Sequence, residues 1–350
     1  MVALTTRRLG QLSIPCPGCC HRFRIRLWHG IQQGTDIIEW QSSGHGSENP
    51  VSFSDRRGFW GFQALEVKPL TDLLPLMTDT PPLSDSAKTA SNRQRFRPLA
   101  EVLHALGFLT RIPVPFIRTI DPPPLAHTMR MFSIVGALIG ALIGVALLGF
   151  ARLHVPPILA AVLAVSAGCL LTGALHEDGL ADFMDGIGGG KTRERRLEIM
   201  RDSRIGTYGT LALIAVFGLR VFALVALLVL PAATIILLMA AAGAFSRALV
   251  VDLLWATKPA RSDGLAVLAG RPTRNVAVFA IVIGLGLTIA TGFVIRPEAG
   301  VIALGLGLAM TAVIRRLAMQ KLGGQTGDVC GAVQVTCETV MLVVFASTIG

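Results

Sequence analysis

Charged residues are scarce in this 350-residue sequence: Asp, Glu, Lys and Arg make up 15% of it, and aromatic residues only 6%, with a single Tyr. Ordinary soluble domains carry about 25% charged residues, so this composition excludes a typical soluble globular protein. Hydrophobic residues make up 52% of the chain, and the mean hydropathy is +0.61. Low charge combined with high hydropathy is typical of an integral membrane protein.

Cysteine is also scarce, with six residues in the chain. Residues 16–21 read CPGCCH, which resembles half of a zinc site but has no second ligand pair at zinc-finger spacing. Cys169, Cys330 and Cys337 lie in apolar surroundings and are expected to be small buried side chains. The sequence therefore predicts neither a structural zinc domain nor a disulfide framework.

Long apolar runs dominate the last two thirds of the chain. A helix needs about 20 apolar residues to cross a bilayer, and runs near that length occupy 131–150, 156–175, 209–230, 232–250, 276–295, 299–314 and 333–349. We therefore predict an all-α polytopic membrane protein with about seven transmembrane helices, with six or eight as alternatives. Gly136, Gly140 and Gly144 recur at a spacing that lets helices pack closely in lipid. Residues 101–115 predict a short interfacial or re-entrant helix ended by two prolines.

The formal net charge of +10 is concentrated in alternate connections between these runs. The basic connections carry Lys191, Arg193, Arg195, Arg196, Arg201, Arg204, Lys258, Arg261, Arg271, Arg274, Arg315, Arg316 and Lys321. With seven spans, all of these connections lie on one side, which the positive-inside rule makes cytoplasmic. The basic charge is thus explained by membrane topology, and no nucleic-acid partner is predicted.

Four carboxylates fall within nine residues directly after the second run, in the stretch HEDGLADFMDG at 176–186. Asp178, Asp182 and Asp185 are spaced i, i+4 and i+7, which places them on one face of a helix. Like charges on one face repel unless a cation neutralises them. Since Mg²⁺ is held by a few carboxylates together with water and phosphate oxygens, these three are predicted magnesium ligands.

A glycine-rich and cationic segment follows the acidic stretch. Glycine-rich turns let backbone N–H groups approach phosphates, while Lys and Arg neutralise their charge. The predicted phosphate-binding residues are Gly188, Gly189, Gly190, Lys191, Arg201 and Arg204. The letters GGGKT do not form a Walker A loop, because Asp185 stands where that motif requires its first glycine.

Further polar residues at the same side complete the set of candidates. Asp328 lies in a second glycine-rich connection, GGQTGD at 323–328, and Glu338 follows within the last run. An acid inside a membrane span is a functional candidate, although it can also be paired with a cation such as Arg247. His176 directly precedes the acids and can act as a base or a ligand.

These motifs resemble those of the cobalamin synthase family, the adenosylcobinamide-GDP ribazoletransferases. The resemblance is carried by FLTRIPVP at 108–115, HEDGLADFMDGIGGG at 176–190, RRLEIMRDSRIGTYG at 195–209 and GGQTGD at 323–328. It implies that a hydroxyl of α-ribazole, or of its 5′-phosphate, attacks the cobinamide-side phosphorus of adenosylcobinamide-GDP and releases GMP. It also implies Mg²⁺ as cofactor and a multi-pass protein of the bacterial cytoplasmic (inner) membrane, with catalytic loops facing the cytoplasm; a homo-oligomer is left open.

His176, Glu177, Asp202 and Asp328 compete for the role of general base or for a second metal ion, and the sequence does not rank them. Two other interpretations are available. A CDP-alcohol phosphotransferase would continue its acidic motif as D-G-x-x-A-R, whereas residues 178–182 read DGLAD. A divalent-cation transporter would place its acids along a path through the spans rather than at one face.

Residues 1–76 have no apolar run, no apparent periodicity and no counterpart in the family. We expect this extension to be disordered or a start-site artefact, because a segment that buries no apolar face cannot offset its ordering entropy. Residues 77–100 are predicted to be a polar lead-in, and residues 101–350 the membrane-embedded ribazoletransferase domain.

Overall fold

The structure, a computed structural model, describes residues 6–15, 22–30, 36–42, 97–114 and 123–349. They belong to two units, residues 1–86 and 87–350, which are treated separately. The CPGCCH motif and most of the polar lead-in lie outside the described residues.

The first unit contains a three-stranded antiparallel sheet in the order β1 (Thr6–Pro15), β2 (Arg22–Gly30), β3 (Asp36–Ser42). Residues 22–27 read RFRIRL, an alternation with the period of two that favours a strand. This alternation corrects the expectation that residues 1–76 have no periodicity. Its period of two differs from the spacing of an apolar span or a helical face. The assignment of residues 1–76 as a non-family extension stays a prediction.

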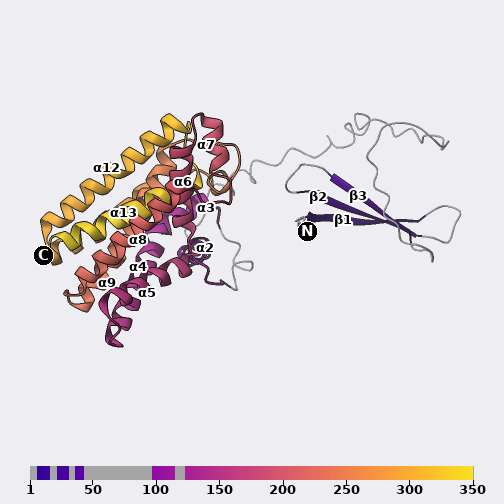
Figure 1. The fold of residues 1–350 in the computed structure, drawn as a ribbon. Coiled ribbons are helices and arrows are strands. Elements are labelled where there is room, and N and C mark those ends of the chain that lie inside the picture. The colour runs from indigo at the N-terminus through magenta and orange to yellow at the C-terminus, as the bar shows by residue number, and fades with distance from the viewer. Residues whose placement is uncertain (1–5, 16–21, 31–35, 43–96, 115–122, 350) are drawn as a thin grey trace. The chain divides into compact units, whose positions relative to one another are not determined.

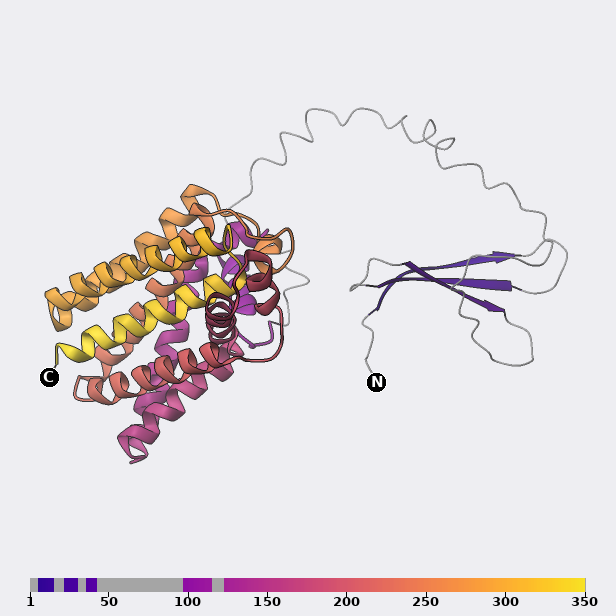
Figure 2. The same ribbon diagram turned by 45° about the horizontal axis from the view of Figure 1, so that its top comes forward.

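The regular elements in the described part of the second unit are all helices, as predicted for a polytopic membrane protein. Its elements are α2 (Pro98–Leu109), α3 (Leu125–Thr128), η3 (Met129–Met131), α4 (Phe132–Arg152), α5 (Pro157–Thr172), α6 (Leu175–Gly189), α7 (Arg193–Ile199), α8 (Thr207–Leu227), α9 (Ala232–Ala256), α10 (Leu265–Ala269), α11 (Arg274–Ile295), α12 (Pro297–Lys321) and α13 (Gly327–Ser347). The long helices run alongside one another, and the C-terminal end of α13 lies at the end of the bundle opposite α6 and α7 (Figures 1 and 2).

Among the described residues, six helices are long and apolar enough to cross a membrane, and α5 with α6 forms a seventh, bent candidate. The predicted count of about seven is therefore confirmed. The run at 299–314 marks only the apolar part of α12, which continues through Arg315 and Arg316 to Lys321. A hydropathy window ends where charge begins, whereas the helix continues beyond the apolar region.

A bend of 91° separates α5 from α6. Two consecutive residues at the corner adopt left-handed conformations, Gly173 with φ 66° and Ala174 with φ 53°. A Cβ at Gly173 would also overlap the side chain of Arg111, whose backbone N–H donates to the carbonyl of Leu171 at 2.8 Å. The segment after α2 thus fixes the corner from which the acidic helix α6 starts.

Helices α9 and α13 form the centre of the bundle. In each, 78% of the most apolar window is buried, compared with 28–33% in the other straight candidate spans. Helix α4 packs against α9 through glycines, as their spacing predicted: a Cβ at Gly136 or Gly140 would overlap the backbone carbonyl of Gly243 or Met239. Close backbone approach of this kind provides packing where lipid offers no hydrophobic driving force.

A second glycine contact joins α6 to α13. A Cβ on Gly331 would lie 2.7 Å from the carbonyl oxygen of His176 and 3.0 Å from Gly179 Cα, while a Cβ on Gly179 would lie 3.1 Å from Asp328 Cα. The two helices therefore touch backbone to backbone. This crossing brings the acidic stretch of α6 beside the first turn of α13.

We predict that Gly331→Ala lowers the melting temperature of the purified protein by several degrees. Overpacking against backbone atoms costs about 1–3 kcal/mol, which exceeds the gain of about 1 kcal/mol from the helix propensity of alanine. Gly286→Ala is the matched control, because no heavy atom lies within 4 Å of a Cβ built there. Equal melting temperatures for the two variants, measured by thermal unfolding in detergent, would contradict the proposed backbone contact.

Candidate active site

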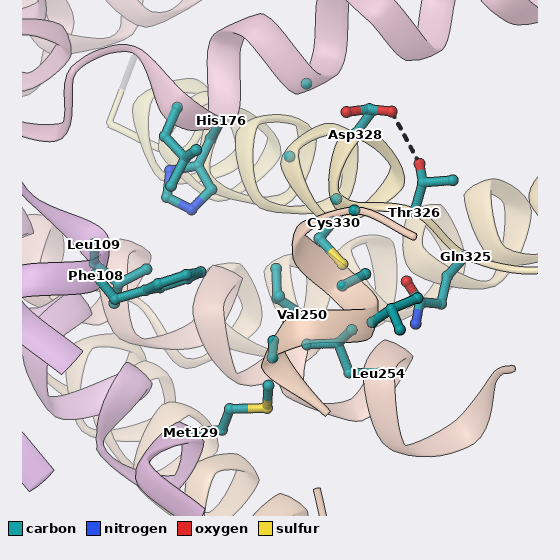
Figure 3. Close-up of a pocket in the computed structure, with 18 of the residues that line it drawn as sticks. Phe108, Leu109, Met129, His176, Val250, Leu254, Gln325, Thr326, Asp328 and Cys330 are labelled. Atoms are coloured by element: carbon teal, nitrogen blue, oxygen red, sulfur yellow. Dashed lines mark hydrogen bonds between the residues drawn. The ribbon is translucent and has the colours of Figure 1, made fainter. Parts of the chain in front are cut away.

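A cavity of about 170 Å³ lies at the crossing of α6 and α13. Figure 3 shows His176 of α6 and Phe108 of α2 on one side of it, and Asp328, Thr326 and Gln325 at the start of α13 on the other. Helix α9 contributes Val250 and Leu254 to the wall. The cavity is thus bounded by apolar side chains of the bundle and by polar side chains of the connecting loops.

Acidic side chains from α6 and α13 converge at this cavity. Asp178 and Asp328 both line it, and Asp182 interacts electrostatically with both of them. Asp328 forms an ion pair with Arg261 at 2.8 Å and accepts a hydrogen bond from Thr326 Oγ1 at 3.1 Å. The two acidic motifs therefore meet at one cavity, where Arg261 is paired with Asp328.

Asp185 points elsewhere and is not among the cavity-lining residues. Its two oxygens accept hydrogen bonds from the backbone N–H groups of Gly206 at 2.7 Å and Gly209 at 2.9 Å. These groups belong to the start of α8, where a carboxylate satisfies free amides and complements the helix dipole. A Cβ at either glycine would overlap this carboxylate. The structure therefore gives Asp185 a positioning role between α6 and α8, although it still interacts electrostatically with Asp182.

Glu177 belongs to a buried charge network instead of the cavity. Arg220 of α8 pairs with Glu177 at 2.9 Å and with Glu338 of α13 at 3.2 Å, while Arg247 of α9 pairs with Glu338 at 3.4 Å. Gln334 donates to Glu338 at 2.5 Å. Two arginines and two glutamates balance in charge, which is required when such groups lie among membrane helices.

His176 is buried and lines both the main cavity and a smaller one of about 30 Å³ beside the charge network. Arg247 of the charge network lines both cavities as well, so the network borders the cavity that contains Asp178 and Asp328. Arg220 was missed by sequence reasoning, although a single arginine within the run 209–230 is the type of signal that marks a paired intramembrane charge.

The glycines of the expected phosphate-binding turn are mostly helical. Gly188 and Gly189 form the last turn of α6, and only Gly190 lies beyond it as the C-cap. A Cβ at Gly188 would overlap the ring of Tyr208, and one at Gly190 would overlap Arg196. Gly188 and Gly189 are thus helical and do not form the expected glycine-rich turn, and Gly188 leaves room for the ring of Tyr208. Their role in substrate binding stays a prediction.

The predicted cations lie at exposed positions on this side of the bundle. Arg201 forms an exposed ion pair with Asp263 at 2.6 Å, and Arg204 forms one with Asp202 at 2.8 Å. The hydrogen bonds from Arg204 lower the pKa of Asp202 to about 2. A carboxyl group with so low a pKa is a weak proton acceptor near neutral pH, which disfavours Asp202 as the general base. Lys191 is also exposed.

The loop after α9 and the loop before α13, which both border the cavity, are joined by contacts that the sequence did not indicate. Arg193 donates to the carbonyls of Leu322 at 2.7 Å and Ala260 at 2.6 Å. The backbone of Gln325 pairs with that of Lys258 at 2.9 Å and of Ala260 at 2.8 Å. These bonds hold the loop after α9 against the loop before α13. They fix the position of Gln325 at the cavity.

The carboxylates fit a magnesium ion only in part. Within the described ranges, no three His, Cys, Asp or Glu side chains converge closely enough to hold a metal by themselves. Asp178 and Asp182 lie one helical turn apart beside Asp328, whereas Asp185 is engaged by amides. One or two carboxylates are the usual protein contribution to a magnesium site whose remaining ligands are water and substrate phosphates.

Comparison with known proteins is consistent with this geometry. The family model described as cobalamin-5-phosphate synthase matches residues 101–346. An adenosylcobinamide-GDP ribazoletransferase of Azorhizobium caulinodans is 45% identical over 253 residues, covering 70% of this chain and 95% of that protein. The protein of the same name from Bradyrhizobium diazoefficiens is 42% identical over 250 residues, covering 71% and 94%. No solved structure matches the chain.

We predict that Asp185→Ala lowers the melting temperature, because it removes the acceptor for two amides at the start of α8. Loss of a cap of this kind costs about 1–2 kcal/mol. Asp178→Ala is the matched control on the same helix, since Asp178 is exposed at the cavity and is expected to leave the melting temperature unchanged. A larger destabilisation by Asp178→Ala than by Asp185→Ala would reverse the assignment.

Proposed function

Because the chain belongs to the cobalamin-5-phosphate synthase family, we propose that it is an adenosylcobinamide-GDP ribazoletransferase, which completes cobalamin by joining α-ribazole, or its 5′-phosphate, to adenosylcobinamide. The observation that carries this proposal is that Asp178 of α6 and Asp328 of α13 line one amphipathic cavity and that Asp182 interacts electrostatically with both, in a chain 45% identical to a protein of that name. A phosphoryl transfer needs such a site, because negative charge must be neutralised where the diphosphate is cleaved.

The reaction forms one oxygen–phosphorus bond and breaks another. A hydroxyl oxygen of the acceptor attacks the cobinamide-side phosphorus, the bond from that phosphorus to GMP breaks, and GMP leaves with the bonding electrons. The hydroxyl proton passes to a protein base. Asp328, which is paired with Arg261, and His176 are the candidates that line the cavity, whereas Glu177 and Asp202 do not line it.

Asp178 and Asp182 are the residues that would hold Mg²⁺, with Asp328 facing them across the helix crossing. When bound, the ion supplies charge neutralisation for the diphosphate oxygens and for the departing GMP. Arg201, Arg204 and Lys191 lie on exposed positions of the connecting loop, and an exposed ion pair such as Arg201–Asp263 can exchange its carboxylate for a phosphate at little cost. They are proposed to bind the diphosphate.

The orientation in the membrane follows from the same arrangement. Loops 176–208, 251–275 and 315–332 lie at one end of the bundle together with the cavity, and they carry most of its basic residues. We place this end in the cytoplasm of a bacterial inner membrane on the positive-inside rule. Both substrates are then bound from the cytoplasmic side.

We predict that Asp178→Asn and Asp182→Asn each lower kcat by about a hundredfold or more, the usual effect of removing a group that organises phosphoryl transfer. The assay mixes purified protein, magnesium, adenosylcobinamide-GDP and α-ribazole, and follows GMP and cobalamin by chromatography. Chelation of divalent metal should abolish product formation, and added magnesium should restore it. Asp202→Asn is the control, because this carboxylate pairs with the exposed Arg204 and does not line the cavity.

The proposal fails if a well-folded wild-type sample forms no GMP under these conditions. The metal assignment fails separately if Asp178→Asn and Asp182→Asn keep the activity of Asp202→Asn.

The topology is tested by cysteine labelling in a variant whose native cysteines are replaced. We predict that Ser203→Cys and Ser262→Cys react with a membrane-impermeant maleimide only after the cytoplasmic side is opened, because both lie on the basic loops. Glu298→Cys, at the start of α12, should react from outside intact cells. Labelling of positions 203 and 262 from opposite sides would exclude a shared site.

A further inference from the structure

We propose that the apolar half of the cavity binds the aromatic base of the acceptor nucleoside, and that the Gln325 side chain forms a hydrogen bond with that nucleoside. The inference rests on the proposed function, because it assigns one of the two substrates of that reaction to a defined place. It adds a substrate-specificity role for the apolar side chains and Gln325, which line the same cavity as Asp178 and Asp328.

The size and lining of the cavity suit a flat aromatic ring. An engineered protein cavity of about 150 Å³ binds benzene, and this one measures about 170 Å³. One wall is apolar and consists of Phe108, Leu109, Met129, Phe132, Val250 and Leu254. A corrin ring system or a guanine nucleotide with its diphosphate does not fit this space, whereas the base of α-ribazole is a compact, fused aromatic ring.

Two aromatic rings make the wall rigid on one side. Phe108 of α2 and Phe132 of α4 stack with centroids 5.7 Å apart and an interplanar angle of 15°. Met129 lies beside them and is fully buried, and a thioether adapts its shape to an aromatic edge. An aromatic base entering here meets ring and thioether surfaces that favour it over an aliphatic group.

Gln325 lies where the apolar part of the cavity meets its acidic part, and its side-chain amide oxygen has no hydrogen-bond partner among the described residues. Its side chain is directed toward the cavity in Figure 3, and only 3% of the residue is exposed. Because its backbone is fixed between Lys258 and Ala260, the amide is held in place before any ligand binds. A buried amide oxygen without a partner is costly unless a ligand donates to it.

The polarity of the cavity sets the orientation of the nucleoside. With the base against the phenylalanines, the ribose lies toward Gln325, Asp178 and Asp328, where a hydroxyl can reach the carboxylates. The donor diphosphate then approaches from the exposed loops that carry Arg201 and Arg204. The attacking hydroxyl and the phosphorus therefore meet at the acidic residues from two directions.

The experiment measures binding of α-ribazole alone to the full chain by isothermal titration calorimetry in detergent. Val250→Phe fills the apolar half and should weaken binding by about tenfold or more, and Gln325→Leu should do likewise, because each removes a shape or hydrogen-bond match. Val301→Phe is the matched control, as Val301 is 70% exposed on α12. In the transferase assay, both cavity variants should raise KM for α-ribazole and leave KM for adenosylcobinamide-GDP unchanged.

A third variant guards against a trivial loss of folding. Leu254→Ala enlarges the apolar half and should shift the kcat/KM ratio toward α-ribazole over its analogue with an unsubstituted benzimidazole, by about threefold to tenfold. Wild-type affinity for α-ribazole in Val250→Phe and Gln325→Leu, with an unchanged ratio in Leu254→Ala, would overturn the inference and leave the proposed function intact. A wild-type protein that neither binds nor consumes α-ribazole would overturn both.

Discussion

The backbone contact between α6 and α13 is the constraint on which the site depends. Gly179 and Gly331 allow the helices to approach until a single Cβ would meet the opposite backbone at about 3 Å. Because Gly179 packs against the backbone of Asp328 itself, Asp178 and Asp328 come to line the same cavity. The glycine contact offsets the repulsion between these carboxylates, and Arg261 neutralises the charge of Asp328. Larger side chains at the crossing would move the two helices apart, and Asp178 and Asp328 would no longer line one cavity.

The buried charge network of arginines and glutamates also holds α6 and α13 in this arrangement. Arg220 connects Glu177 on α6 with Glu338 on α13, and Arg247 adds α9 to the set. Leaving any one of these charges unpaired among apolar helices would cost several kcal/mol, so the four residues act as one unit. The network thereby fixes the rotation of α6 about its own axis. This rotation determines which acids face the cavity and which, such as Asp185, face α8.

The sequence predicted the spans and the two acidic motifs well, because hydropathy and helical spacing are local properties. It could not separate Asp185 from Asp178 and Asp182, since the i, i+4, i+7 pattern describes one helix and not the neighbour that packs on it. The helical packing of Gly188 was missed for the same reason, because its neighbour is Tyr208 of α8. Arg193 and Gln325 were missed because their roles arise from contacts across about 65 and 130 residues of chain.

The composition of the cavity explains why membrane helices serve a reaction between water-soluble molecules. The phosphate chemistry requires charged groups and an aqueous approach, which the loops at one end of the bundle provide. Holding an aromatic base still requires a rigid apolar wall, which the tightly packed ends of α2, α4 and α9 provide through Phe108, Phe132 and Val250. These two environments meet only where the spans end. The backbone bonds from Gln325 to Lys258 and Ala260 hold the two loops together at this position. The loops therefore recognise the polar part of the ligand, and the helix ends recognise its apolar part.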